Sequence, residues 1–491
     1  MELSIAGMVD GPESSPFTSQ ERMARLKDYV SAWEALQFQD PETIKVREPC
    51  IWNMTGGLLS YGTFDTGHGN GSATTTNLVF RKLASRTRCI EGRVWSYDVP
   101  RKVYLMDTDL YQDLLILVTM DPTIEAQCAI MHISLHQLST GEAHPKAHRP
   151  LIDHEVAYEI VEPNRCFIST CRNYVAILCY KMVNSDDDQS DVHVSDAMFC
   201  IYDWESGDLA WCIKDSIRSF TFISESHVLL ALLPNSKDSP CAGVLAVVNF
   251  IDQHRLSCYS VTTALLLPIL ATNSVAYDIS VRSSPPPGVV GPSAAFPDPI
   301  PFSTAHDSRL ITVNLHLHQS KQFLFCIPLS TIRRFMGGEA QVVTRLIDCV
   351  EQGLPWESWG PDGSQMTWRV GQPAVCYSWG NRCSVERTGQ VWRSRFPICC
   401  DFNPLLFKQH LRDIQTNGEL ENSSVLIDNA NTNGTGIFQG DMSTSLPCMM
   451  KRMPGLFLFG VVMLNEDHLV RLTASVDNDG DIQRFDIYQI S

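Results

Sequence analysis

Two stretches with the same order of residues, FISTCRNYVAILCY at 167–180 and FISESHVLLALL at 222–233, indicate how this chain folds. Each has a Phe and a Ser, then a short polar step, and then an apolar run with the length of a buried strand. A third copy is FSTAHDSRLITVNL at 302–315. Because turn and strand recur in one order, the sequence predicts a repeated β unit.

The polar step is found at six places, and a strand-like run follows each of them. The six steps are Gln112-Asp113, Arg172-Asn173, Ser226-His227, Asp307-Ser308, Asn381-Arg382 and Glu466-Asp467. A second turn recurs downstream, as Ser139-Thr140-Gly141 and as Glu205-Ser206-Gly207. The period is about 60 residues once two insertions are set aside, which is longer than the usual propeller blade.

These repeats predict an all-β fold. Residues 51–100 form a degenerate first unit, so that the whole chain has about seven units, within the usual range for a β-propeller. We therefore predict an about seven-bladed β-propeller preceded by a short N-terminal helix. An irregular β-sandwich, or two small β domains, is the alternative.

The helix is predicted from apolar spacing near the N-terminus. Apolar residues recur on one helical face over residues 19–37, and Thr18 and Glu21 form a capping box ahead of it. We assign residues 1–40 to this leader and helix, and residues 41–491 to the propeller with its two insertions. The insertions lie near 283–301 and 415–445. The first is Pro-rich and is predicted to be a mobile surface loop between blades, because prolines remove backbone donors.

Charge and composition exclude several classes of partner. The chain has 491 residues and a net charge of -17, which argues against nucleic acid and against an anionic membrane surface. The longest apolar runs, at 261–271 and 456–464, are shorter than the about 20 residues that a membrane span needs. The 17 cysteines are odd in number and many lie in apolar runs, as reduced core cysteines do. We predict a cytoplasmic protein, with the nucleus as the alternative location.

No catalytic, cofactor or metal motif is evident in the sequence. The Gly-rich run GHGNGS at 67–72 lacks the Lys-Ser or Lys-Thr step of a phosphate loop. His316 and His318 share one face of a predicted strand without a local third ligand, and His144, His148 and His154 are assigned to a Pro-flanked loop. We predict no metal, no cofactor and no enzymatic activity, with a propeller-fold hydrolase as a distant alternative.

Four tryptophans are the candidate protein-interaction residues. Trp356, Trp359 and Trp368 lie in LPWESWGPDGSQMTW at 354–368, and Trp379 follows in CYSWGNR. Exposed Trp is common at interaction hot spots. The alternative is that these side chains pack between blades, as most Trp side chains do.

Several motifs together resemble one protein family. They are AGMVDGP at 6–12, ERMARLKDYVSAW at 21–33, PWESWGP at 355–361, YSWGNR at 377–382, DFNP at 401–404, STSLPC at 443–448 and VVMLNEDHLV at 461–470. With these motifs the chain resembles the β-propeller-like C-terminal portion of F-box domain proteins of mushroom-forming fungi. The resemblance covers nearly the whole chain and carries over no catalytic residue.

The resemblance implies the substrate-receptor part of an F-box-type ubiquitin ligase subunit. In such a subunit the propeller binds an unknown client protein while the F-box binds the ligase adaptor. Only 18 residues precede the helix here, and Gly7, Gly11, Pro12 and Pro16 interrupt any helix among them. We therefore expect adaptor binding only if an F-box is present upstream. A free-standing propeller scaffold with no ubiquitin role is the alternative.

Overall fold

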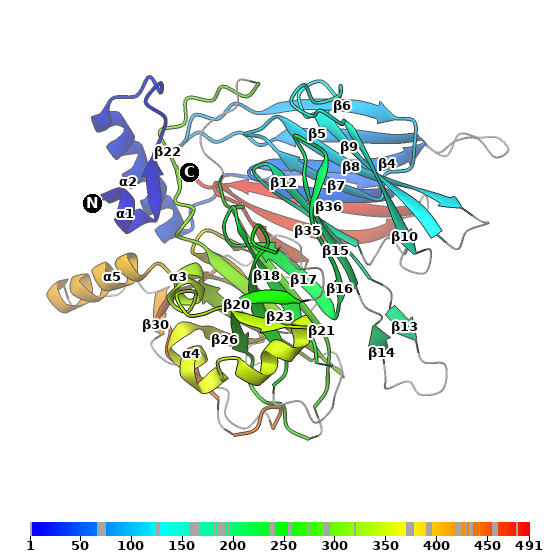
Figure 1. Ribbon diagram of the computed structural model, residues 1–491. Helices are drawn as coiled ribbons and strands as arrows, with labels where there is room; N and C mark the ends of the chain where they lie inside the picture. Colours follow the sequence, from blue (N-terminus) through cyan, green and yellow to red (C-terminus); the bar gives the residue numbers. More distant parts are fainter. Residues whose placement is uncertain are drawn as a thin grey trace.

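The computed structural model describes residues 2–491 except 66–74, 124–127, 158–165, 181, 185–191, 195–196, 235–240, 254–257, 273, 289–294, 319–320, 370–377, 389–394, 418–423, 428–429, 432–435, 441, 454–459 and 478–479. Over the described residues the chain forms seven antiparallel sheets of four or five strands (Figure 1). The first strands of successive sheets contact one another from β3 (Pro49–Thr55) round to β34 (Val461–Leu464). The sheets are therefore the seven blades of a β-propeller, as predicted.

Each blade runs from an inner strand to an outer one. Blade 1 contains β3, β4 (Leu58–Asp65), β5 (Thr75–Lys82) and β6 (Arg93–Val99); blade 2 contains β7 (Leu105–Asp109), β8 (Leu114–Thr123), β9 (Cys128–Gln137) and β10 (Leu151–Ala157); and blade 3 contains β11 (Cys166–Cys171), β12 (Tyr174–Cys179), β15 (Ala197–Asp203) and β16 (Asp208–Asp215). Blade 4 contains β17 (Ile217–Phe222), β18 (His227–Leu232), β19 (Val244–Asn249), β20 (Tyr259–Leu266) and β25 (Gln341–Val343), and blade 5 contains β21 (Ala276–Ser283), β23 (Leu310–Leu317), β24 (Lys321–Pro328) and β26 (Gln365–Arg369). Blade 6 contains β27 (Ser378–Trp379), β28 (Arg382–Thr388), β29 (Arg395–Asp401), β33 (Cys448–Arg452) and β30 (Ser424–Ile427), and blade 7 contains β34, β35 (His468–Asp477), β36 (Gly480–Gln489) and β2 (Glu42–Arg47).

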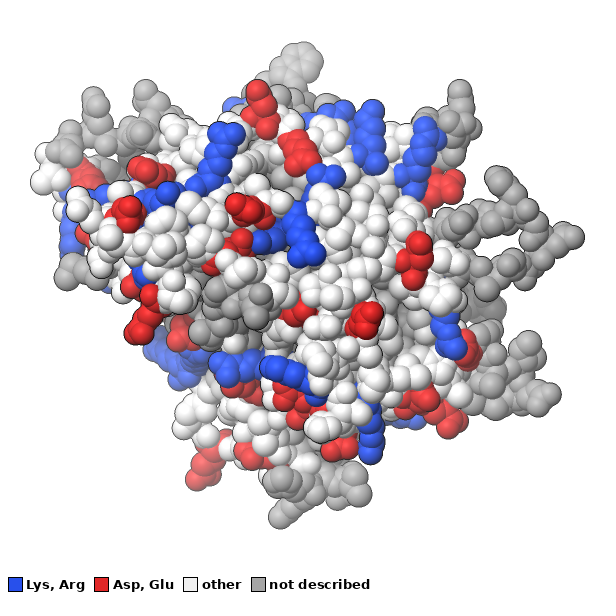
Figure 2. All heavy atoms as spheres, turned by 90° about the horizontal axis from the view of Figure 1, so that it is seen from above, with Lys and Arg blue, Asp and Glu red and all other residues white. Residues whose placement is uncertain are grey.

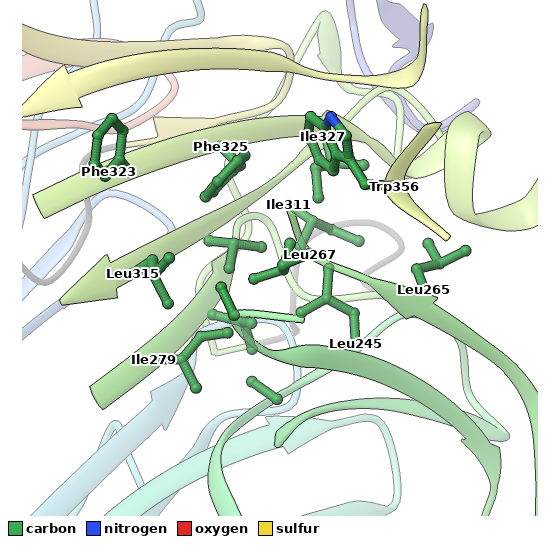
Figure 3. Close-up of a cluster of buried hydrophobic side chains, with 14 of the residues drawn as sticks. Leu245, Leu265, Leu267, Ile279, Ile311, Leu315, Phe323, Phe325, Ile327 and Trp356 are labelled. Atoms are coloured by element: carbon green, nitrogen blue, oxygen red, sulfur yellow. The ribbon is translucent and has the colours of Figure 1, made fainter. Parts of the chain in front are cut away.

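The second strands of the blades explain the continuous apolar runs of the sequence. All of Val228–Leu232 in β18 is buried, because blades pack on both faces of such a strand. The packing of blade 4 on blade 5 is drawn in Figure 3, where Leu245, Ile279, Ile311 and Phe325 point into one cluster. Similar clusters lie between the other blades, so the core is a ring of interfaces.

Five of the six polar steps lie where an inner strand turns into the second strand of its blade. The exception is Asp307-Ser308, which follows β22 (Phe302–Thr304) and comes just before β23, the second strand of blade 5. Asp113 and Arg172 have positive φ values of 54° and 50° in two of these turns. Residues 139–141 and 205–207 connect the third and fourth strands of blades 2 and 3. The degenerate unit predicted over residues 51–100 corresponds to blade 1. The predicted register of the repeat is therefore confirmed at five of the steps, whereas the Phe-Ser lead-in of the third copy lies in β22 and not in the inner strand β21.

The two ends of the chain close the ring. Strand β2 comes from the N-terminal side and pairs with β36, so that Ile44 lies opposite Phe485. Blade 7 thus consists of three C-terminal strands and one N-terminal strand. Figure 1 shows the C-terminus beside the N-terminal helices.

A helical cap precedes β2. It comprises α1 (Glu2–Ala6), β1 (Met8–Asp10) and α2 (Ser19–Ala35), and β1 pairs with β22 (Phe302–Thr304). The Thr18 side chain accepts from the Glu21 amide and the Glu21 carboxylate accepts from the Thr18 amide, which confirms the capping box. Leu26, Tyr29 and Trp33 are buried against blades 6 and 7, so the apolar stripe of α2 is covered by the propeller.

The Pro-rich stretch is not a loop between blades, and its described parts are packed. It connects the first two strands of blade 5 through β22. Phe296 is buried against Trp95 with the ring centroids 5.5 Å apart, and Asp298 forms a 2.5 Å ion pair with Lys82. The prediction of a mobile surface loop was therefore wrong, because apolar residues between the prolines contact blade 1.

The remaining elements are inserted in or beside blades 3 to 6. The insertion near 415–445 falls inside blade 6 and supplies its fifth strand, β30. The other elements are α3 (Leu329–Arg334), the 3-10 helix η3 (Leu346–Gln352), α4 (Trp356–Gly363), α5 (Pro404–Asn417), and the two-stranded pairs of β13 (Met182–Asn184) with β14 (Val192–Val194) and β31 (Ala430–Asn431) with β32 (Ser443–Thr444). No helix in the described part of the chain is long and apolar enough to cross a membrane.

Candidate functional site

The cap is attached to the propeller by specific contacts. Tyr29 in α2 donates its hydroxyl to the Glu466 carbonyl at 2.6 Å, and the Arg382 guanidinium lies over the Trp33 ring, 4.7 Å from its centroid. At the start of the chain, the Asn403 side-chain amide donates to the carbonyl of Ile5 at 2.6 Å. The contacts reach the inner turns of blades 6 and 7. The N-terminal segment thereby covers this face of the propeller at blades 6 and 7, and we call this side the capped face.

A buried ionic cluster of Arg88, Glu466 and Asp467 lies beneath the cap. Arg88 comes from the turn between β5 and β6 of blade 1, and it contacts Glu466 at 2.7 Å and Asp467 at 2.6 Å. The other oxygen of Glu466 accepts from both the amide and the hydroxyl of Thr304. Burial raises the pKa of Glu466, although Arg88 opposes this shift. The ionic cluster joins blade 7 to blade 1 and to β22, where the ring closes.

A small cavity adjoins the ionic cluster. Its volume is about 30 Å³ and its lining includes Arg88, Tyr111, Phe296 and Asp467. This volume has room for one or two water molecules beside the ionic cluster.

The structure places the candidate tryptophans at two separate sites. Trp356 and Trp359 lie in α4, where their rings are 4.9 Å apart, and they are only 3% and 2% exposed. Figure 3 shows Trp356 pointing into the cluster between blades 4 and 5. Trp379 lies instead beneath the cap, 8% exposed, and donates to the Thr304 hydroxyl at 3.0 Å.

Burial at these positions favours the packing alternative. The Trp359 indole N–H is also satisfied internally, by the carbonyl of Leu266 at 3.1 Å. The backbone of Trp368 belongs to β26, opposite Phe323, and its side chain lies outside the described residues. That these tryptophans contact a partner stays a prediction, and the structure brings only Trp356 and Trp359 together.

The buried carboxyl group of Asp107, in the inner strand of blade 2, is contacted from the inner strands of blades 1 and 3. Its Oδ1 accepts from the Asn53 side-chain amide at 3.1 Å and from the Thr108 amide at 2.9 Å. Burial raises the pKa of Asp107 to about 7, although hydrogen bonds from Thr108 and Thr170 lower it. A buried carboxyl group with such a pKa is a candidate functional group, and it makes stability depend on pH.

We expect Asp107→Asn to stabilise the protein at pH 8 by about 2 kcal/mol. The raised pKa means that the folded state binds more protons than the unfolded state between about pH 4 and pH 7. The free energy of unfolding of the parent therefore falls as pH rises through this range, and Asn removes that loss. Thermal unfolding at pH 5 and pH 8 tests this, with the exposed Asp28→Asn as the control. Equal shifts at both pH values would contradict the role of Asp107.

Charges are mixed on the surface that Figure 2 displays. Lys and Arg side chains lie among Asp and Glu side chains, without a broad basic field among the coloured residues. A nucleic-acid interface needs clustered basic residues, so this face offers none in its described part.

The histidine predictions have different outcomes. His316 and His318 lie against the ring of Tyr277, with centroids 5.9 Å and 5.5 Å away, and the described residues bring no third ligand to them. His144 and His148 lie in the loop between β9 and β10, as predicted, whereas the prediction was wrong for His154, which is in strand β10. Its imidazole lies near Cys200 and Cys212, a group that the sequence analysis missed. The run at 67–72 lies outside the described residues.

Comparison with known proteins adds little to this assignment. No protein-family model and no curated protein matches the chain. The chain is similar to a mutant apocarotenoid oxygenase of Synechocystis at 8% identity and a TM-score of 0.26, covering 64% of this chain and 61% of that one, which is less than two thirds of the oxygenase. It is also similar to the β-propeller domain of the Trilobed protease from Pyrococcus furiosus at 10% identity and a TM-score of 0.24, covering 74% and 95% of the two chains. The strand pairing itself defines a seven-bladed β-propeller closed by its N-terminal strand.

Proposed function

We propose that this chain is a protein-interaction scaffold, and more narrowly the substrate-receptor part of an F-box-type ubiquitin ligase subunit. The observation that carries the proposal is the attachment of α1 and α2 to the propeller through the capped face. A domain joined before Met1 would be held in a defined orientation to the blades. A receptor needs such a connection, because holding two reacting groups close together raises their effective concentration.

The motifs that resemble the F-box family converge on this attachment. Tyr29 and Glu466, from two of these motifs, form the hydrogen bond between α2 and blade 7. Arg382 and Asp401, from two others, form a 2.9 Å ion pair beneath the cap. Motifs that lie more than 400 residues apart thus meet in one interface, which supports the cap as the feature that the resemblance reflects.

Burial of α2 also bears on how an adaptor would bind. The apolar stripe with Leu26, Tyr29 and Trp33 is used against the propeller. A stable interface buries about 800 Å² on each partner, and this stripe offers no such area in the folded chain. We therefore expect adaptor binding only if an F-box is present upstream, and client binding at surfaces away from the capped face.

Fusion of an F-box before Met1 tests the proposal. We expect the chain as printed to fail to co-purify with the ligase adaptor, and we expect the fusion to form a one-to-one complex. Size-exclusion chromatography with light scattering measures the complex, and the isolated F-box is the positive control. A folded fusion that does not bind, while its F-box alone does, would contradict the receptor role and favour the free-standing scaffold. Adaptor binding by the unfused chain would contradict the assignment of α2.

A further inference from the structure

Three potential metal ligands lie where blade 2 meets blade 3. His154 is in β10, the outer strand of blade 2, whereas Cys200 and Cys212 are in β15 and β16 of blade 3. The two cysteines are register partners across the β15–β16 ladder. The donor atoms of the three residues all lie within 4.8 Å of one another. The described residues bring together no other group of this kind.

From this juxtaposition we infer a binding site for a soft metal ion, with Zn²⁺ as the expected occupant, held by His154 Nε2, Cys200 Sγ and Cys212 Sγ. Two thiolates and an imidazole are a common donor set for zinc. The three protein donors leave a fourth position for a water molecule or for the Met198 thioether, which lies 3.2 Å from Nε2. Hard ions such as Mg²⁺ and Ca²⁺ prefer oxygen donors, and the group contains no carboxylate.

The spacing of the donors requires only a local adjustment. Tetrahedral bonds of about 2.3 Å to sulfur and about 2.0 Å to nitrogen place two sulfurs about 3.8 Å apart, and sulfur and nitrogen about 3.6 Å apart. Cys200 Sγ is 3.7 Å from His154 Nε2, which already fits. The two sulfurs are 2.6 Å apart and have to separate by about 1 Å. Cys212 is exposed, so its side chain has room to turn.

Tyr202 orients the imidazole for ligation. Its hydroxyl contacts Nδ1 of His154. When Nδ1–H donates to the Tyr202 oxygen, Nε2 keeps its lone pair toward the two sulfurs, as ligating histidines require.

An ion at this site would connect two blades through their outer strands. Ile152 and Val156 of β10 already pack with Met198 and Cys200 in the apolar cluster between blades 2 and 3. The ion would add bonds at the rim of this cluster, where Cys212 is exposed. Because it binds the folded chain and rarely a preformed site in the unfolded chain, it would also stabilise the fold.

Metal binding by the reduced protein tests the inference. We expect one equivalent of Zn²⁺ per chain in competition with a chromophoric chelator. In Co²⁺-loaded protein we expect a thiolate-to-cobalt charge-transfer band and the intense d–d bands of tetrahedral coordination. A parallel anaerobic titration with Cu⁺ identifies which soft ion binds more tightly.

Variants separate this site from the other cysteines. Cys212→Ser and His154→Ala are expected to weaken zinc binding at least about 100-fold, and Tyr202→Phe by roughly 10- to 100-fold. Cys89→Ser, a matched control distant from the site, should bind as the parent does, and thermal unfolding without metal checks that each variant folds. Equal affinity of Cys212→Ser and the parent would overturn the inference. So would a parent that takes up no Zn²⁺, Co²⁺ or Cu⁺ while mild oxidation links Cys200 to Cys212, because the pair would then be a thiol–disulfide couple.

Discussion

Val46→Asp is expected to open the ring and to cost about 4 kcal/mol or more in the free energy of unfolding. Val46 lies in β2, the strand that closes blade 7, and is 4% exposed within a cluster that includes Phe485 and Ile487. An unpaired carboxylate there either remains buried at a large cost or detaches β2 from β36. Detachment would expose the edge of β36, a surface prone to pair with other chains.

The neighbouring residue supplies the control for this prediction. Lys45 is exposed on the same strand and lies opposite Arg484, so Lys45→Asp should change stability by no more than about 0.5 kcal/mol. Chemical denaturation followed by circular dichroism, together with light scattering for aggregation, compares the two variants. If both variants unfold at the denaturant concentration of the parent, β2 does not close the ring.

Arg88→Ala is expected to destabilise the protein by about 3–5 kcal/mol, because it leaves two buried carboxylates without their cation. The side chains of Arg88, Glu466 and Asp467 are only 5%, 4% and 4% exposed. The loss should be smaller at low pH, where Glu466 with its raised pKa takes up a proton more readily. Denaturant titrations at pH 5 and pH 8 measure both effects.

Two further variants serve as controls for the Arg88→Ala result. Arg86 lies two residues away on the surface, so Arg86→Ala should leave the free energy of unfolding nearly unchanged. A variant with Arg88→Met, Glu466→Gln and Asp467→Asn removes all three charges together. We expect it to be more stable than Arg88→Ala, because the effects of mutations at interacting charges on the free energy of unfolding do not add. Equal losses in these two variants would show that Arg88 acts through its packing and not through its charge.

The repeat could be predicted from the sequence because its signals are local. A polar step such as Arg172-Asn173 adopts the turn within its own blade, and the apolar run beside it forms the strand. The capping box of Thr18 and Glu21 is local in the same sense. By contrast, Phe296 contacts Trp95, about 200 residues earlier in the chain. Nothing near the prolines indicates that contact, and the stretch was therefore misread as a mobile loop.

For the candidate sites, too, the sequence indicates local pairings but not contacts between distant segments. Cys200 and Cys212 lie at equal distances from Ser206, the centre of the predicted turn, so their pairing across a hairpin could have been found. The approach of His154 could not, because it requires that blade 2 pack on blade 3 through β10. The burial of Trp356 and Trp359 could not be predicted either. Pro and Gly around them indicate an exposed loop, and only the packing of their helix on the core shows that they are buried.

The pairing of β2 with β36 also governs how the protein can be made in a cell. Glu42 is synthesised 445 residues before its partner Ile487 (487 − 42). At about 5–20 residues per second, translation of the intervening chain takes about 20–90 s. Throughout that time β2 has no partner strand, and the blades already synthesised form an open arc with an exposed edge. We expect nascent chains to associate with chaperones until β36 has been synthesised, and fusion partners to be tolerated only if they leave residues 42–47 free to reach β36.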